Sequence, residues 1–189
     1  RKLSFYDTET VAELAWPEAS QKITKRSPAT KVFTDFNQYE PLVIEASMSA
    51  LEAEKLMQQS HVRLKLVVDS SDHFLGIISL DDLSTQEVMK KLSEGYQREE
   101  LFVTDFMRPR SVLKAFSYAE ITAATIGDII NSLQGSGQQH ALVIDREHHK
   151  IRGIISSSDI ARKLKLPIDI DNKSSFAHIF AVVNHRIAS

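Results

Sequence analysis

Apolar residues along this chain fall into short runs of strand-like length, and turn residues separate them. Leu64–Val68 and Phe74–Ser79 are two such runs, and residues 70–72 between them read Ser-Ser-Asp, which favours a turn. His140–Ile144 and Ile151–Ile155 form a second pair of the same kind. The pattern therefore predicts two hairpins of short, largely buried strands.

Helical spacing occurs beside each hairpin. Apolar residues from Ala50 to Met57 recur every three or four positions, and Ser47 or Ser49 precedes them as a candidate N-cap. The same spacing predicts a helix over 125–133. Further helices are expected from Asp81 onward and over 159–166, and shorter β runs over 41–44 and 112–116.

The remaining segments are less regular. Residues 8–15 have the spacing of a short helix, which Trp16-Pro17 ends because the residue before proline is forced out of the helical region. Residues 20–30 are polar and basic and predict an extended arm or loop, whereas 83–101 read as a connecting helix. A final amphipathic helix is expected from Ser175. Its apolar residues suit either the core or a contact between two copies: Phe176, Ile179 and Phe180.

The two halves of the chain repeat one another. Each half has the element order β-α-β-β-α, which predicts an α+β fold made of two similar units. One helix over a small three-stranded sheet leaves a face or edge uncovered, so the two units are expected to bury those surfaces against each other. Residues 117–124 are extra in the second half and predict a loop or short helix. Three segments return in order: 32–36 as 102–106, 65–69 as 141–145, and 76–83 as 153–160.

Composition narrows the classes of function. The 189 residues are 42% hydrophobic and 25% charged, as in ordinary globular proteins. The 25 acidic residues nearly balance 23 basic ones, for a net charge of −2, which argues against a general nucleic-acid binder. The absence of cysteine excludes disulfides, thiolate metal sites and a cysteine nucleophile, and it fits a cytoplasmic protein. No apolar run reaches the ~18 residues that predict a membrane span.

Each half also carries a recognisable motif. A hydrophobic strand ends in Asp, and a turn then leads to Gly-hydrophobic-x-Ser-x-x-Asp, at 76–82 in the first half and 153–159 in the second. Residues 103–109 add the lead-in Val-Thr-Asp-Phe-Met-Arg-Pro, whose counterpart in the first half lacks the Met and Pro. Over residues 32–166 the chain therefore resembles a tandem pair of CBS domains, the Bateman module named after cystathionine β-synthase.

This resemblance implies a non-enzymatic module that binds an adenosine-containing ligand, such as AMP, ADP or ATP, in a cleft between the repeats. The resemblance implies that such a module requires no cofactor. The residues suit that chemistry: the strand ending at Ser156 leads into a helix whose first N–H groups lack internal partners and attract phosphate. Asp159 can accept hydrogen bonds from a ribose diol, as the family's aspartate does. The candidate ligand-binding residues are Ser156, Ser157, Ser158, Asp159, Arg162, Ser79, Asp82, Val43, Ile44, Val112 and His140.

The other candidates supply the rest of such a cleft. Strand backbone near 43–44 and Val112 would meet the adenine, and Arg162 would reach a phosphate. Gly76 and Gly153 would leave room for close approach of the ligand to the backbone. The second half is the better candidate, because it has more hydroxyl groups and nearby basic residues.

A purely structural interpretation stands beside this one. Ser-x-x-Asp resembles a capping box, in which the Ser caps a helix and the acid three residues on reaches back. Caps alone would explain both copies of the motif. The chain would then be a ligand-free CBS pair that serves as an interaction or dimerisation scaffold.

Other sites are less favoured. His148 and His149 are adjacent on a turn and therefore point apart, which disfavours a metal site, and no serine has the glycine pattern of a nucleophile elbow. The basic residues between 22 and 31 read as a solvated face rather than a partner patch. Met57 and Met89 read as core residues.

The expected organisation follows from these points. We expect a homodimer in the cytoplasm that signals to an unidentified effector protein, with neither membrane nor nucleic acid as partner. The predicted parts are an N-terminal arm at 1–30, repeat 1 at 31–83, a connecting helix at 84–101, repeat 2 at 102–166 and a tail helix at 167–189.

Overall fold

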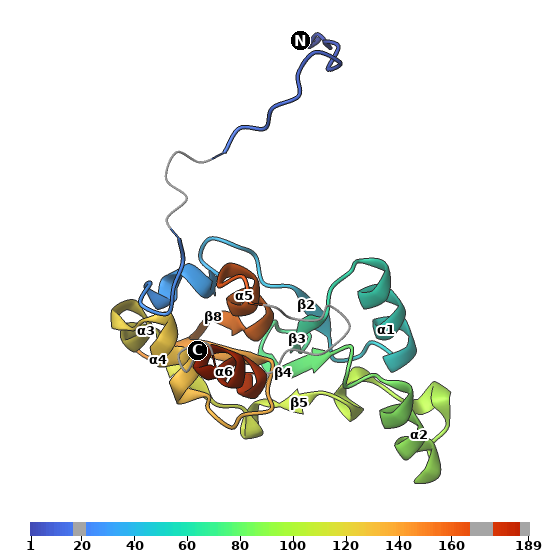
Figure 1. Ribbon diagram of the computed structural model, residues 1–189. Coiled ribbons are helices and arrows are strands. Elements are labelled where there is room, and N and C mark those ends of the chain that lie inside the picture. Colours follow the sequence, from blue (N-terminus) through green and yellow to red (C-terminus); the bar gives the residue numbers. More distant parts are fainter. Residues whose placement is uncertain (17–21, 167–175, 186–189) are drawn as a thin grey trace.

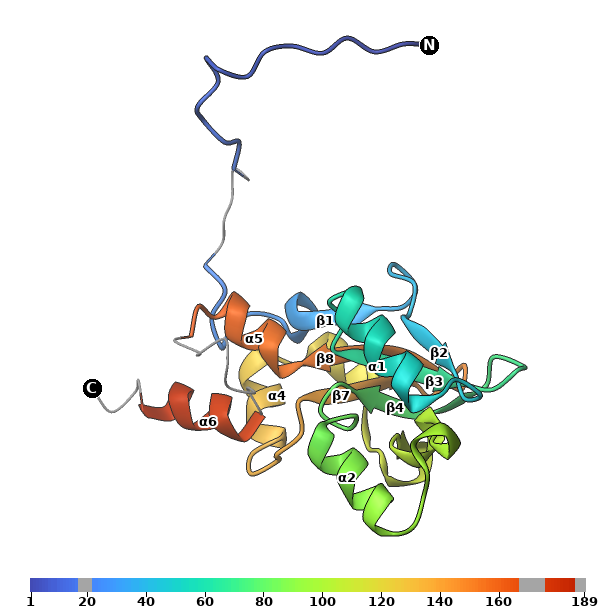
Figure 2. The same ribbon diagram turned by 90° about the vertical axis from the view of Figure 1, so that its right-hand side faces the viewer.

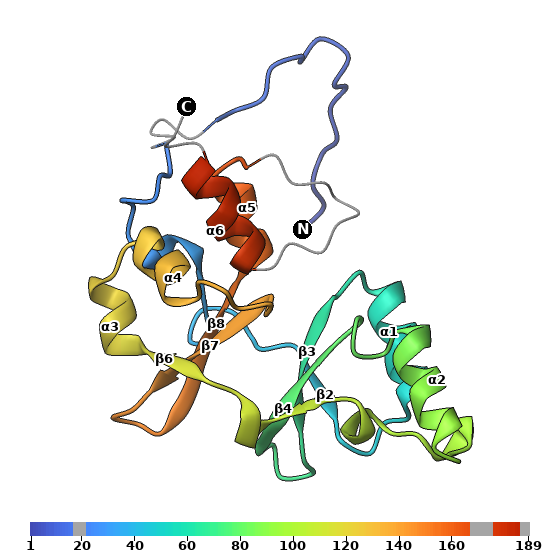
Figure 3. The same cartoon turned by 60° about the horizontal axis from the view of Figure 1, so that its bottom comes forward.

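The computed structural model describes residues 1–16, 22–166 and 176–185, and two four-stranded sheets form its centre (Figure 1). The sheet of repeat 1 has the strand order β2-β3-β4-β5, and the sheet of repeat 2 has the order β1-β8-β7-β6. Figure 3 shows the two sheets side by side. The strands are β1 (Phe33–Asp35), β2 (Val43–Glu45), β3 (Leu64–Val68), β4 (Phe74–Ser79), β5 (Arg108–Pro109), β6 (Ala115–Ser117), β7 (His140–Asp145) and β8 (Lys150–Ser156).

The two repeats exchange their first strands. β1 is the first strand of repeat 1 in the chain but pairs antiparallel with β8 of repeat 2, and β5 is the first strand of repeat 2 but pairs antiparallel with β4 of repeat 1. Each incoming strand crosses a glycine. A Cβ on Gly153 would overlap the carbonyl oxygen of Thr34, and a Cβ on Gly76 would overlap that of Arg108. The space that these glycines leave is therefore taken by the exchanged strands, rather than by a ligand.

The helices follow the predicted spacing closely where they flank the hairpins. The Ser49 hydroxyl accepts the Glu52 N–H, so Ser49 rather than Ser47 is the N-cap. Thr125 and Asp128 form a reciprocal capping box, which fixes the start of the second predicted helix. The helices are α1 (Ala50–Gln59), α2 (Thr85–Ser93), α3 (Tyr118–Ala123), α4 (Ile126–Ser132), α5 (Ser157–Lys163) and α6 (Phe176–His185).

Each sheet has its own apolar core. Met57, Val67 and Ile78 are buried in repeat 1, as the spacing of α1 and the hairpin predicted. The core of repeat 2 also takes in α6, whose Phe176 and Ile179 are fully buried against α4 and α5. In Figure 2, α6 lies beside α4 and α5, at the far end of the molecule from the β3–β4 hairpin. Of the two interpretations of the apolar residues of α6, the structure therefore selects the core, and Phe180 packs against it.

Residues 22–32 form a loop and a helical turn that are tied to repeat 2, so that of the predicted extended arm or loop the structure shows the loop. The Ala29 N–H donates to Ala124 O at 2.9 Å, and the Gly127 N–H donates to Lys25 O at 2.8 Å. Ala29 and Val32, in the helical turn η1 (Ala29–Val32), are buried. Part of the predicted arm (residues 17–21) and the start of the predicted tail helix (residues 167–175) lie outside the described residues.

Residues 1–16 run as an extended segment away from both repeats (Figures 1 and 2). The helix predicted over 8–15 is wrong: a single turn, closed by the Val11 N–H on Thr8 O, takes its place. A helix this short is unstable in water unless its apolar face packs against something, and this segment packs against neither repeat.

Several other boundaries differ from the predictions. The helix expected at Asp81 begins at Thr85, and the predicted helix over 83–101 ends at Ser93, before a turn η2 (Arg98–Glu100). Val112 lies in the helical turn η4 (Arg110–Val112), and not in a strand. Met89 is exposed, so its assignment to the core is wrong as well.

The insertion in repeat 2 forms α3, the short helix that was one of its two predicted forms. No helix among the described residues is long and apolar enough to cross a bilayer.

Candidate functional site

The Ser-x-x-Asp box of repeat 2 lies at the junction of β8 and α5. The Ser156 hydroxyl accepts the Asp159 N–H at 3.4 Å and lies 2.7 Å from the Ser158 hydroxyl. The Asp159 carboxylate does not return to Ser156 but pairs with Arg162 on the next turn. Ser157 is buried, and its N–H donates to Gln139 O at 2.9 Å. The box is thus half of a capping box, and its carboxylate is bound outside the box.

The corresponding box of repeat 1 is closed on itself. Both the N–H and the hydroxyl of Ser79 donate to the Asp82 carboxylate, at 2.9 and 2.8 Å, and the Asp82 N–H donates back to Ser79. The chain then makes a turn, and Ser84 caps α2 separately. Both carboxylate and hydroxyl are therefore used within the box, as in a structural cap.

Polar residues of both repeats meet between these boxes. The Gln139 side-chain amide donates to the Asp81 carboxylate at 3.2 Å, which joins the loop before β7 to repeat 1. Arg108 on β5 lies 3.7 Å from the Asp82 carboxylate. His140, the first residue of β7, interacts electrostatically with Arg108, Asp81 and Asp159. This group is called here the junction cluster: Asp81, Asp82, Arg108, Gln139, His140 and Asp159.

Two nitrogen atoms of the junction cluster are buried without a hydrogen-bond partner among the described residues. They are Nδ1 of His140 and Nε of Arg108. Such atoms are costly to bury, because they lose their bonds to water and gain none in return. Their presence in one cluster, contributed by two repeats, indicates a place where an additional polar group would be stabilised.

The His140 imidazole is neutral over the physiological pH range. Burial and, to a smaller extent, the nearby Arg108 charge lower its pKa from 6.5 to about 4, against the opposing effect of Asp159 and Asp81. A neutral imidazole has one N–H donor and one nitrogen acceptor. His140 can therefore meet either a hydroxyl or a phosphate oxygen without a change in its charge.

The structure brings only some of the predicted site residues together. Ser156, Asp159 and His140 surround one edge of the junction cluster, and Asp82 contributes from repeat 1. The three residues proposed for adenine contact differ in their surroundings. Val43 is exposed on β2, Ile44 is buried in the core of repeat 1, and Val112 is exposed on η4.

Three members of the junction cluster were missed from the sequence, namely Arg108, Gln139 and Asp81. Arg108 stands inside the lead-in motif and Asp81 inside the box, but their neighbours come from the other repeat, so spacing gave no signal. Gln139 directly precedes a predicted strand, and this position was the only sign in the sequence that it could belong to the site.

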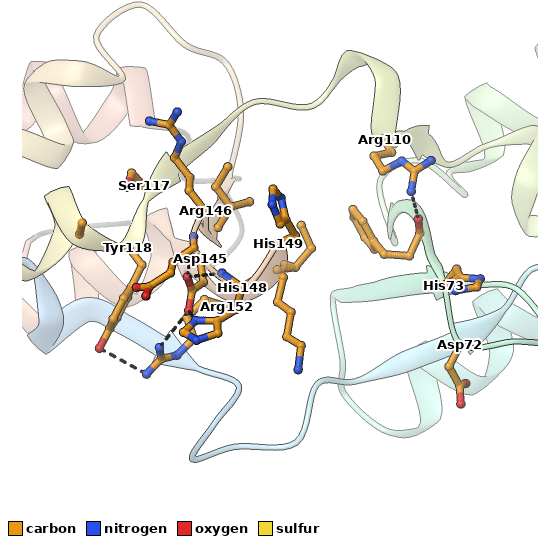
Figure 4. Close-up of a pocket in the computed structure, with 16 residues that line it drawn as sticks. Asp72, His73, Arg110, Ser117, Tyr118, Asp145, Arg146, His148, His149 and Arg152 are labelled. Carbon is orange, nitrogen blue, oxygen red and sulfur yellow. Dashed lines mark hydrogen bonds and ion pairs between the residues drawn. The ribbon is translucent and has the colours of Figure 1, made fainter.

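A wide hollow of about 1310 Å³ lies at the other end of the sheets, between the hairpin turns of the two repeats (Figure 4). Some of its charged side chains are engaged in hydrogen bonds and ion pairs. Arg152 donates to both carboxylate oxygens of Asp35, at 2.8 and 3.1 Å, and its guanidinium stacks 4.0 Å from the centre of the Tyr118 ring. Arg110 donates to Phe74 O, and His148 bonds Asp145. These contacts hold the exchanged strand β1 and the hairpin turns in place.

The bond from Arg152 holds the pKa of the Asp35 carboxyl below its usual value, although burial opposes this effect. Backbone and side-chain bonds from His148 likewise lower the pKa of Asp145. Both carboxylates are therefore ionised partners of the strand exchange. In the described part of the chain, no group of three or more His, Asp or Glu residues could hold a metal ion.

The crossed strands and paired Ser-x-x-Asp boxes define a module of two intertwined α+β repeats. The chain belongs to the CBS domain family, whose model matches residues 34–92 and 103–166, and it is a tandem CBS pair, or Bateman module. No curated protein matches it in sequence.

Solved structures share this architecture at low sequence identity. An uncharacterized conserved protein from Pyrococcus horikoshii is 18% identical with a TM-score of 0.56, over 78% of this chain and 98% of that chain. A conserved CBS domain protein of unknown function from Thermoplasma acidophilum is 16% identical with a TM-score of 0.52, over 82% and 77%. CBSX2 from Arabidopsis thaliana, solved in complex with AMP, is 21% identical with a TM-score of 0.51, over 72% and 94%. These similarities establish the fold alone.

Proposed function

We propose that this Bateman module senses an adenine nucleotide of the AMP, ADP or ATP class at the junction cluster, beside the open box of repeat 2. One observation carries the proposal: His140 Nδ1 and Arg108 Nε are buried without partners in the same cluster as the Asp159 carboxylate, which is paired only with the exposed Arg162 side chain. The module has no catalytic role of its own and reports ligand occupancy to another protein.

Each residue has a part in the proposed complex. Asp159 leaves its surface pair with Arg162, which is weak because the Arg162 side chain is largely exposed, and accepts the ribose hydroxyls. Phosphate oxygens accept hydrogen bonds from the Ser156 and Ser158 hydroxyls and from the Arg108 guanidinium. The phosphate gives Arg108 the close negative partner that it lacks in the free protein. His140 supplies a hydrogen bond that it does not make in the free protein.

The fold also supports this proposal. CBSX2, of similar fold, is described in complex with AMP, so a CBS pair of this architecture accommodates an adenine nucleotide. A signal to a partner requires that the nucleotide bind two states of the module with different affinity. The junction cluster joins both repeats through Gln139 and Asp81, so a ligand there would bias their relative packing. The module is expected to act as a homodimer with an effector protein.

Titration calorimetry of the full chain with AMP, ADP, ATP, S-adenosylmethionine and NAD tests the proposal. An adenine nucleotide should release or absorb heat with a single site per chain. Asp159→Ala should weaken binding at least about tenfold, because the ribose loses its acceptor. Asp128→Ala is the matched control, because Asp128 closes a capping box with Thr125 outside the junction cluster, and it should retain binding within about threefold. The absence of both heat and melting shift at millimolar nucleotide would exclude the sensing function.

A second function is favoured by the geometry of repeat 1. Its closed box shows the pattern expected of a structural cap, which is the ligand-free scaffold interpretation applied to that repeat. If no nucleotide binds to the wild type or to either variant, the module acts as a scaffold. The measurement that then tests it is its binding to candidate effector proteins.

A further inference from the structure

The helices of repeat 1 present an uncovered apolar groove. α2 is amphipathic, yet none of its residues is buried. Leu51 on α1 is 65% exposed and Met89 on α2 is 53% exposed. Between the two helices lies a narrow groove lined by Ala50, Leu51, Glu54, Leu83, Val88, Arg98 and Leu101, called here the α1–α2 groove. Exposed apolar surface of this kind marks a place where another element packs.

The equivalent groove of repeat 2 is filled by a helix. By position in the repeat, α4 corresponds to α1 and the β8–α5 junction corresponds to the β4–α2 junction. There α6 packs against both α4 and α5 and buries Phe176, Ile179 and Val183. The pseudo-symmetry of the module therefore indicates what the α1–α2 groove lacks, namely a short amphipathic helix with apolar residues three or four positions apart.

The chain carries one such segment without a partner. Val11, Leu14 and Ala15 have helical spacing, and they precede Trp16, whose side chain is 79% exposed. The segment stays extended in the single chain, because nothing covers its apolar side. A short helix of this kind forms when a groove binds it, so that folding and docking occur together.

The α1–α2 groove of the same chain lies far from the point where this segment joins repeat 2. Residues 22–32 are anchored on repeat 2, while α1 and α2 lie at the opposite end of the molecule (Figures 1 and 3). The six residue steps from Trp16 to Lys22 span at most about 20 Å, which limits where the arm can reach. A second copy of the chain can present its α1–α2 groove to the arm without this limit.

We propose that residues 8–15 of one copy fold as a helix in the α1–α2 groove of a second copy, with Trp16 at its end, in a reciprocal exchange of arms. The contact is mainly apolar, through Val11, Leu14 and Trp16 against Leu51 of the groove and against the exposed Met89, which follows the groove residue Val88 on α2. The segment carries two acids, Glu9 and Glu13, and no base, whereas the two charged residues that line the groove, Glu54 and Arg98, are of opposite sign, so the groove itself has no net charge to repel it. This contact is independent of nucleotide binding.

Trp16 makes the docking directly visible, because it is the single tryptophan of the chain. Its fluorescence should shift to shorter wavelength as the protein concentration rises from submicromolar to about 100 μM, in parallel with dimer formation measured by light scattering. Leu51→Glu should weaken this association about tenfold or more, since it places a charge where an apolar side chain packs. Leu42→Glu is the matched control, because Leu42 is also exposed but lies outside the groove, and it should leave the shift unchanged.

Complementation between variants tests the exchange itself. Leu14→Asp removes a working arm and Leu51→Glu removes a working groove, so each variant alone should stay monomeric. An equimolar mixture should form a heterodimer through one intact arm and one intact groove, and restore part of the Trp16 shift. Met89→Glu, which places a charge beside the groove residue Val88 on α2, should also weaken the association, and circular dichroism of each variant confirms its fold.

Four results would overturn the proposal: no shift with concentration, a short-wavelength emission that does not depend on concentration, a shift that survives both groove variants, or dimers that persist in Leu14→Asp.

Discussion

The two repeats carry the same Ser-x-x-Asp box and use it differently. In repeat 1 the carboxylate of Asp82 returns to Ser79 and closes the box. In repeat 2 the helix starts at once, and Asp159 pairs forward with Arg162 instead. The motif therefore caps a helix in repeat 2 and closes a turn in repeat 1, where Ser84 caps α2 instead. What decides the availability of the box for a ligand is whether the carboxylate is already engaged.

The largest expected effect concerns the glycines that admit the exchanged strands. Gly153→Ala should reduce the free energy of unfolding by about 3 kcal/mol or more, because the added methyl would collide with both the Thr34 carbonyl and the Phe33 ring. Gly76→Ala should cost less, since its main obstacle is the backbone of the two-residue strand β5. Urea denaturation measures both. Equal midpoints for wild type and Gly153→Ala would refute the close approach of β1.

The second-largest effect on the free energy of unfolding should come from the arginines at the two strand exchanges, and it should differ between them. Arg152→Met should lower the free energy of unfolding by about 2–3 kcal/mol, because it leaves the ionised Asp35 carboxylate largely buried without its two hydrogen bonds. Arg108→Met should change it by about 1 kcal/mol or less, since Arg108 lies 3.7 Å from Asp82 and forms no hydrogen bond through Nε. The same urea series compares them, and a larger loss for Arg108→Met would reverse the assignment of the stronger exchange.

His140 gives repeat 2 a pH dependence that repeat 1 lacks. Leu64 occupies the matching position, opposite Ser79, as His140 lies opposite Ser156. Because the folded pKa of His140 is lowered to about 4, the unfolded chain takes up its proton first as the pH falls. About 2 kcal/mol of stability should therefore be lost between pH 7.5 and pH 5.

The variant His140→Leu copies repeat 1 at this position and should flatten that part of the stability profile. Thermal unfolding measured at half-unit steps of pH provides the comparison. A profile with the same slope in both proteins would show that His140 does not carry it.

The smallest expected effect is the difference in free energy of unfolding between variants of the two Ser-x-x-Asp boxes, measured without ligand. Asp82→Ala should cost about 1–2 kcal/mol, because it removes an acceptor used by two bonds from Ser79. Asp159→Ala should cost about 0.5 kcal/mol or less, because it removes only a surface pair with Arg162. Differential scanning calorimetry of the two variants without ligand gives the answer, and a greater loss for Asp159→Ala would contradict the open state of its box.

The strands of the hairpins and the helices beside them could be predicted from the sequence. Leu64–Val68 and Phe74–Ser79 form with the predicted bounds, because buried strands flanked by turn residues have a local signature. The helix caps at Ser49 and Thr125 follow for the same reason. Such features depend on residues only a few positions apart.

Features that depend on distant neighbours could not be predicted in this way. β1 and β5 are three and two residues long, and nothing in so short a run says which sheet it will join. Residues 8–15 have helical spacing but no surface to pack against in the single chain, so propensity alone did not suffice. The junction cluster was missed for a related reason, since Arg108 meets Asp82 only through the strand exchange.

The reciprocal strand exchange also has a consequence for the integrity of the molecule. A single proteolytic cut after Gly95, in the exposed connector behind α2, would leave β1 on the first fragment and β5 on the second. Each fragment would hold the edge strand that the other needs, so the nicked protein should stay associated and recover its fold by fragment complementation. Neither repeat can be gained, lost or excised alone without depriving the survivor of a strand.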